Sequence, residues 1–192
     1  MTVKRVLWEG FVAGTAGTVA MTLSERVEQR LTGRPDSHVP GRVLARLAGT
    51  PEPRGKRLRL LNWVMHFGQG ALLGVLRSTM AHAGLRGASS SAQFAVVRLT
   101  NDQILENATG VGAPPPTWPR TELVVDLLHK TSYGFATGLV ADALAARSGP
   151  GPGQRHAAVL PGRHPNVSPL PRSSRRARRP AHTPSTRRAS TK

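Results

Sequence analysis

The sequence predicts an all-α protein, in which residues 1–146 form a four-helix transmembrane bundle and residues 147–192 form a disordered basic tail. Three observations predict this fold. First, the chain contains long stretches without internal proline, which are too long to be strands. Second, a helix formed by such a stretch has a broad apolar side and a narrow polar stripe. Third, glycines recur along these stretches at helical spacing. A helix with a wide apolar side is typical of a protein whose helices meet lipid on one side and one another on the other.

The last predicted helix shows this arrangement most clearly. It is expected to run from about Arg120, just after Pro119, to Ala145. At 3.6 residues per turn, Glu122, Asp126 and Lys130 fall on one polar stripe. The broad apolar side is made of Leu123, Val124, Leu127, Leu128, Phe135 and Leu139.

The first predicted helix, Val6–Leu23, is 18 residues long, which corresponds to about 27 Å and approaches the ~30 Å thickness of a bilayer core. A cleaved signal peptide is the competing interpretation, because Lys4 and Arg5 precede the apolar run. Glu9 interrupts that run and favours the membrane helix.

Glycines are predicted to form the contacts between helices. Several glycines would cost a helix in water about 1 kcal/mol each, whereas in lipid they allow two backbones to approach closely. The predicted helix-packing glycines are Gly10, Gly14, Gly17, Gly70, Gly74, Gly134 and Gly138.

The middle of the chain predicts two further helices. Glu25–Arg59 is expected to be a connector, whose one amphipathic piece, Gly41–Gly49, either lies along the membrane interface or is an ordinary solvated loop helix. Leu60–Leu76 is the second predicted span. Ala92–Asn107 is the third and the least apolar, and a charge at its centre would cost about 2.5–3.5 kcal/mol on insertion. It is therefore expected to insert only with its neighbours or to stay partly interfacial. Gly110–Pro119 is expected to form an extended link.

Charge is concentrated in the tail. The formal net charge is +17, and eleven of the 27 Lys and Arg residues follow Ala146, where no acid occurs. The SRRARR run at 174–179 is expected to bind anionic lipid head groups or nucleic acid nonspecifically, by charge alone. Aromatic residues make up only 4%, which argues against a nucleic-acid module built on stacking. The absence of cysteine excludes disulfides and thiolate metal sites.

Four pieces of the chain resemble a family of small bacterial membrane proteins of unknown function, similar in layout to the YagU-type inner-membrane proteins. The pieces are GFVAGTAGTVAMT near the start, GRPDS, GALLGVLR, and the pattern P-x-W-P…E…D-x-x-H-K-x-x-Y-G-x-x-T-G-x-x-x-D. They lie between Gly10 and Asp142. The resemblance implies four transmembrane helices, and it implies no catalytic residue.

The candidate functional residues are ionisable groups that the helical pattern places inside the bundle. Asp126 with Lys130, and Arg98 with Asp102, are four residues apart and can pair, so these groups either form a path for protons or ions or only stabilise the bundle. Asp126 and His129 have the spacing of a metal-binding helix, but no second such helix exists, and neither a metal nor another cofactor is predicted. The full set of predicted buried polar residues is Glu9, His66, Arg98, Asp102, Asp126, His129 and Lys130.

The function predicted from these features is that of an integral, multi-pass protein of the cell membrane, non-enzymatic and structural or interactive in role, with the lipid bilayer as its surroundings. Both termini are expected in the cytoplasm, with Lys4, Arg5, Arg77, Arg86 and the tail charges on that side. One alternative is a soluble helical protein that binds nucleic acid through its tail, which the mean hydropathy of −0.27 favours. The other alternative is a small transporter or proton-conducting subunit.

Overall fold

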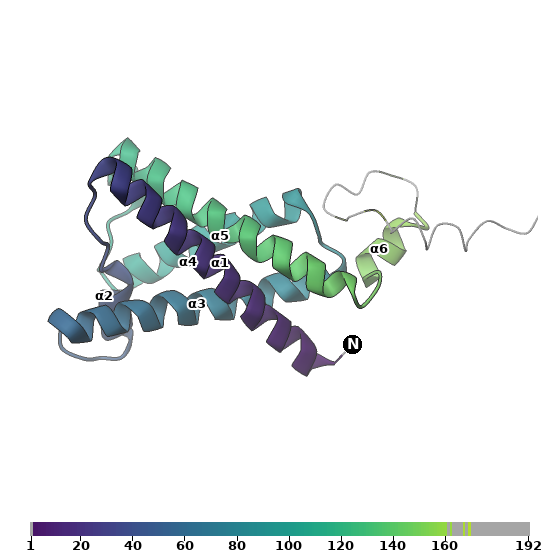
Figure 1. The fold of residues 1–192 in the computed structure, drawn as a ribbon, viewed down its shortest axis with the longest axis horizontal. Coiled ribbons are helices and arrows are strands. Elements are labelled where there is room, and N and C mark those ends of the chain that lie inside the picture. Colours follow the sequence, from purple (N-terminus) through teal and green to yellow (C-terminus); the bar gives the residue numbers. More distant parts are fainter. Residues whose placement is uncertain (1, 161, 163–166, 168, 170–192) are drawn as a thin grey trace, which may run out of the picture.

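The computed structural model describes residues 2–160, 162, 167 and 169, and this part of the chain contains helices and no strand. The predicted all-α class is therefore confirmed. Four long helices dominate, and three short elements lie in or after the connections (Figure 1). The long helices are α1 (Val3–Thr32), α3 (Gly55–Ala83), α4 (Ala88–Ala108) and α5 (Arg120–Ala146), and the short elements are α2 (Val39–Leu47), the 3-10 turn η1 (Pro115–Thr117) and α6 (Pro152–Ala157).

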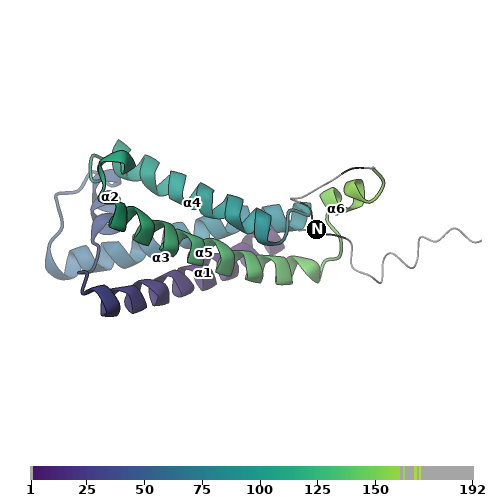
Figure 2. The same cartoon turned by 90° about the horizontal axis from the view of Figure 1, so that it is seen from above.

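The four long helices alternate in direction, as Figures 1 and 2 show. We call one end of the molecule the α2 end, where α1 and α4 finish and α3 and α5 begin. The opposite end is the α6 end, where α1 begins and α5 finishes. The first residues of α1 and the last residues of α5 therefore lie at the same end.

Glycines allow α1 to lie directly against α3. A Cβ atom added to Gly74 would overlap the backbone of Gly10 and Gly14, and one added to Gly14 would overlap the backbone of Gly70. Gly17 also approaches α5 closely, and a Cβ atom added there would overlap the side chain of Thr137. The closest contacts between α1 and α3 are thus made by backbone atoms, which is typical of helices that associate without a hydrophobic driving force.

Helix α4 packs chiefly against α5. Gly134 of α5 lies against Ala95, and Gly138 lies against Ser91. Phe94 and Tyr133 are fully buried beside one another, with their ring centroids 5.7 Å apart. These contacts leave space between α3 and α4 at the α2 end.

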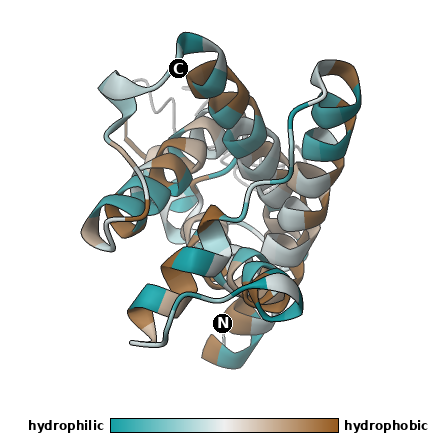
Figure 3. Cartoon of the chain, turned by 90° about the vertical axis from the view of Figure 1, so that its left-hand side faces the viewer, coloured by the Kyte–Doolittle hydropathy of each residue, from teal (hydrophilic) through white to brown (hydrophobic). Residues whose placement is uncertain are grey.

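Large apolar side chains point outward from the long helices. Leu72 of α3 is 66% exposed and Leu139 of α5 is 73% exposed, while Arg77 and Thr18 are completely buried. Figure 3 shows apolar residues, in brown, interspersed with hydrophilic residues, in teal, along the helices. Judged by length and composition alone, one of the described helices, α1, is long and apolar enough to cross a membrane. The long helices thus bury several charged or polar side chains while large apolar side chains are exposed on their outer sides.

The first helix is longer than the sequence analysis predicts. Its apolar run ends at Leu23, but α1 continues to Thr32 and ends where Gly33 adopts φ 72° and donates its N–H to the carbonyl of Gln29. Part of the predicted connector from Glu25 is therefore helical. Hydropathy marks where apolar residues stop, whereas the end of a helix depends on backbone capping.

Two other segments differ from the prediction. The link before α5 contains the 3-10 turn η1, although Gly110–Pro119 is predicted to be extended. The tail is predicted to have no structure after Ala146, but α6 forms there, and Gln154 is buried next to Gly84 at the end of α3. The SRRARR run at 174–179 lies outside the described residues.

Candidate solute-binding cavity

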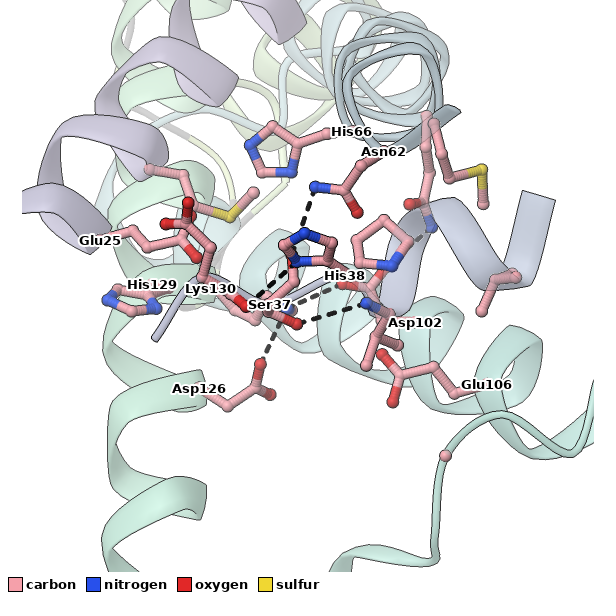
Figure 4. A pocket seen from close by; sticks show the side chains of 18 of the residues that line it. Glu25, Ser37, His38, Asn62, His66, Asp102, Glu106, Asp126, His129 and Lys130 are labelled. Carbon is pink, nitrogen blue, oxygen red and sulfur yellow. Dashed lines mark hydrogen bonds and ion pairs between the residues drawn. The ribbon is translucent and has the colours of Figure 1, made fainter. Parts of the chain in front are cut away.

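A cavity of about 570 Å³ lies among the four long helices at the α2 end (Figure 4). Its walls come from the second half of α1, the first half of α3, the second half of α4 and the first half of α5, and α2 with the loop before it covers one side. Arg26, Arg59 and Glu122 belong to the lining and are exposed. The cavity is therefore open to the surface at this end.

A cluster of charged side chains forms the inner wall of the cavity. Lys130 Nζ lies 2.9 Å from Asp102 Oδ2 and 2.8 Å from Asp126 Oδ1. Arg98 Nε donates to Asp102 Oδ2 at 3.1 Å, and Gln69 Nε2 donates to Asp102 Oδ1 at 2.7 Å. Asp102 thus connects α3, α4 and α5.

The two predicted intrahelical pairs are both present, but they form one network. Lys130 bridges them, because it contacts Asp102 on α4 as well as Asp126 on its own helix. Arg98 is 3% exposed and Asp102 is 7% exposed. Such burial is stable only when the opposite charge and further hydrogen bonds are present, as they are here.

The cavity ends at a packed layer in the middle of the molecule. The Tyr133 hydroxyl donates to the carbonyl oxygen of Gly70 at 2.6 Å, and the Arg98 guanidinium lies 4.9 Å from the centre of the Tyr133 ring. Thr18 is fully buried against Gly70 on the α1 side. These contacts close the inner end.

The histidines of the lining have different surroundings. Nε2 of His66 lies 3.1 Å from the hydroxyl of Thr22. His129 is buried, and its Nε2 has no hydrogen-bond partner among the described residues. Both residues are predicted from the sequence, and the structure brings both to the cavity.

Two acids of the cavity are absent from the predicted set. Glu25 of α1 and Glu106 of α4 are half-buried, and neither forms an ion pair with another described residue. Glu25 lies beyond the apolar stretch of α1, where the sequence predicts a connector. A signal for Glu106 exists in the sequence: it follows Arg98 and Asp102 at intervals of four, and therefore shares their side of α4.

The cover of the cavity is held in place by polar contacts. Asn62 Oδ1 accepts a hydrogen bond from the backbone N–H of Gly41 at 2.9 Å, and Asn62 Nδ2 donates to the carbonyl of Ser37 at 3.3 Å. Arg34 pairs with Glu28 at 2.9 Å. This ion pair fixes the loop before α2 to the end of α1.

Glu9 lies far from these groups, at the α6 end. Its carboxylate contacts Arg5 Nε at 2.6 Å and His82 Nε2 at 2.7 Å. A second ion pair, which the sequence pattern does not predict, joins the buried Arg77 to the half-buried Asp142 at 2.8 Å and also lies at this end. The predicted polar residues therefore divide into two groups instead of one.

The described residues contain no group of three or more His, Asp or Glu side chains arranged to hold a metal ion. Asp126, the carboxylate in the spacing typical of a metal-binding helix, points toward Lys130 (Figure 4).

Comparison with family models, with curated proteins and with solved structures found no match for the chain. The geometry of the cavity is therefore the basis for assigning a function.

Proposed function

We propose that the chain is a multi-pass membrane protein whose four long helices cross the bilayer as a bundle, and that it binds a small polar solute in the cavity at the α2 end. The observation that carries this proposal is a combination of two features: charged side chains line a cavity between the helices, and leucines and valines are exposed on their outer sides. The resemblance to YagU-type proteins is consistent with the same architecture. The proposed role is that of a non-enzymatic binding protein.

Helix lengths support membrane insertion. The four long helices have 21 to 30 residues, or about 31–45 Å, which is enough for a bilayer core of about 30 Å even when a helix is tilted.

The mean hydropathy of a whole helix understates what lipid would meet. It counts inward residues such as Lys130 equally with outward residues such as Val124, which is 64% exposed, and Leu128, which is 51% exposed. In the bundle, only the outward side contacts lipid, and the inward charges are paired with one another. This favours insertion of α3, α4 and α5 together with α1.

The alternating helix directions support a common location for both chain ends. The start of α1 and the end of α5 lie at the α6 end, together with Lys4, Arg5 and Arg86 (Figure 1). With these charges and the eleven basic residues after Ala146 in the cytoplasm, the cavity would open on the opposite side of the membrane. The nine Lys and Arg residues of Glu25–Arg59 would then lie on that side too, against the positive-inside rule.

Membrane extraction gives the first test. The full chain, and a chain ending at residue 160, are both expected to stay in the membrane pellet after an alkaline carbonate wash, because the apolar surface belongs to the four long helices. Release of either protein into the supernatant as a monomer that needs no detergent would contradict the membrane assignment and would favour a soluble protein that acts through its basic tail.

Cysteine accessibility gives a sharper test, because the natural chain has no cysteine and hence no background. Met65 is half-buried in the cavity wall, while Leu72 is 66% exposed on the outer side of the same helix. In membranes, Met65→Cys is expected to react with a water-soluble cationic thiol reagent at least tenfold faster than Leu72→Cys, since a thiolate forms only where water reaches.

If the protein were soluble in water without detergent, the order of the two labelling rates would be reversed, because Leu72 is more exposed than Met65. Faster labelling of Leu72→Cys in membrane preparations would therefore overturn the membrane assignment. An unreactive Met65→Cys would overturn the hydrated cavity. Labelling of Met65→Cys from one side of sealed vesicles would identify the compartment onto which the cavity opens.

A further inference from the structure

We infer that the solute of this cavity is a small organic cation with one or more ammonium groups, held by the carboxylates of Glu25 and Glu106. This inference rests on the proposed binding function and gives its ligand a chemical class. It is drawn from the balance of charge in the lining, from the positions of the unpaired acids and from the aromatic side chains near the opening.

The inner walls carry more acid than base. Four carboxylates and two cations line the part of the cavity between the helices, and both cations are already engaged: Lys130 by two carboxylates, and Arg98 by one carboxylate and by the Tyr133 ring. Glu25 and Glu106 remain without an ion pair among the described residues. An entering anion would meet a single unpartnered donor, Arg98 Nη1, on a cation that already faces Asp102, whereas an entering ammonium group would meet two carboxylates that have no ion pair.

The charges at the rim nearly cancel. Three arginines and two acids belong to it, and one of the arginines, Arg34, is neutralised by Glu28 just outside the lining. The negative excess therefore comes from the inner walls. The rim residues are Arg26, Arg34, Asp36, Arg59 and Glu122.

The unpaired acids stand on separate walls. Glu25 belongs to α1 and Glu106 to α4, and Figure 4 shows them on opposite sides of the cavity with Lys130 between them. Two further atoms of the lining that can accept hydrogen bonds have no partner in the described part of the chain, namely Oδ2 of Asp126 and Nε2 of the buried His129. A ligand with several N–H donors would satisfy these atoms, which are otherwise costly to bury.

The size and walls of the cavity favour an organic ligand over a bare metal ion. A volume of about 570 Å³ is within the range of pockets for small organic molecules. Trp63 and Trp118 belong to the lining, and the faces of indole rings attract ammonium groups.

Three probes with the same four-carbon chain test the sign of the ligand's charge. Butane-1,4-diamine carries two positive charges, succinate carries two negative charges and butane-1,4-diol carries none. Each is added to the full-length Met65→Cys protein in membranes at constant ionic strength, and protection of the thiol from labelling is measured against probe concentration. We expect butane-1,4-diamine to protect the thiol and the other two probes not to protect it.

Substitution of the two acids assigns the binding groups. Glu25→Gln and Glu106→Gln, each in the Met65→Cys background, are expected to raise the half-protecting diamine concentration about tenfold, since each removes one charge-assisted hydrogen bond. Glu25→Asp and Glu106→Asp keep the charge and are expected to retain most of the affinity, which separates loss of charge from a folding defect. Glu52→Gln is the matched control, because Glu52 is an exposed acid outside this cavity, and it is expected to change nothing.

The outcomes distinguish this inference from the proposed function. Protection by succinate or by the diol at least as strong as by the diamine would overturn the cationic class while leaving a solute-binding cavity. A reactive Met65→Cys that no probe protects would also overturn the inference but not the hydrated cavity. Unchanged diamine protection in both Gln variants would overturn the assignment to Glu25 and Glu106. An unreactive Met65→Cys would overturn the inference together with the cavity on which it rests.

Discussion

Asp102→Ala is expected to lower the free energy of unfolding by on the order of 3–5 kcal/mol, the typical result of removing one partner from a buried ion pair. It would leave the buried Arg98 guanidinium without its carboxylate and would remove one of the two carboxylates of Lys130. Asp126→Ala is expected to have a smaller effect, because Lys130 would keep Asp102. Reversible unfolding of the detergent-solubilised protein measures both changes.

Two comparisons identify the source of that loss. The double change Arg98→Ala and Asp102→Ala is expected to be less harmful than the sum of the single changes, since it removes the cation that would otherwise be left unpaired. Glu52→Ala, which removes the exposed partner of Arg42, is expected to cost less than about 1 kcal/mol. If Asp102→Ala were as mild as Glu52→Ala, the buried network would not be a source of stability.

Gly74→Leu is expected to separate α1 from α3 and to lower stability by about 3 kcal/mol, the upper end of the usual cost of overpacking. Any side chain at this position meets the backbone of Gly10 and Gly14, which cannot move aside as a flexible side chain can. The measurement is the midpoint of thermal unfolding, with helix content recorded to detect loss of structure.

Gly68→Ala is the matched control for this substitution. Gly68 belongs to the same helix, and a Cβ atom there would have no other atom within 4 Å. Because alanine favours helix more than glycine does, this change is expected to be neutral or to stabilise α3 by about 0.5–1 kcal/mol. Equal destabilisation by the two changes would mean that close contact between α1 and α3 does not determine the result.

Much of the helical framework can be predicted from the sequence because its signals are local. Pro119 fixes the start of α5, and the predicted end at Ala145 is one residue from the observed end. The predicted end of α1 at Leu23 is wrong, because the residues that follow are polar yet remain helical. The glycine that caps this helix, Gly33, lies further along the chain.

The site can be predicted only in part, because its main contacts join different helices. Spacing along one helix predicts the pairs Arg98 with Asp102 and Asp126 with Lys130. It contains no information on how α4 is rotated against α5, which decides whether Lys130 reaches Asp102. The cavity itself depends on the position of α2 and the loop before it, and no local pattern specifies that position. For the same reason, spacing alone does not separate Glu9 from the other ionisable residues, although it lies at the opposite end.

The packed layer at Tyr133 and Gly70 makes the cavity a dead end. In a membrane, a dead end exchanges solute with one compartment only, so its occupancy would follow the concentration on that side. A cation that moves from the opening toward the packed layer would also cross part of the transmembrane voltage, which over the full bilayer amounts to about 2.3 kcal/mol per charge at 100 mV. The fraction of molecules with a bound cation would therefore depend on voltage as well as on concentration, without any ion passing through the protein.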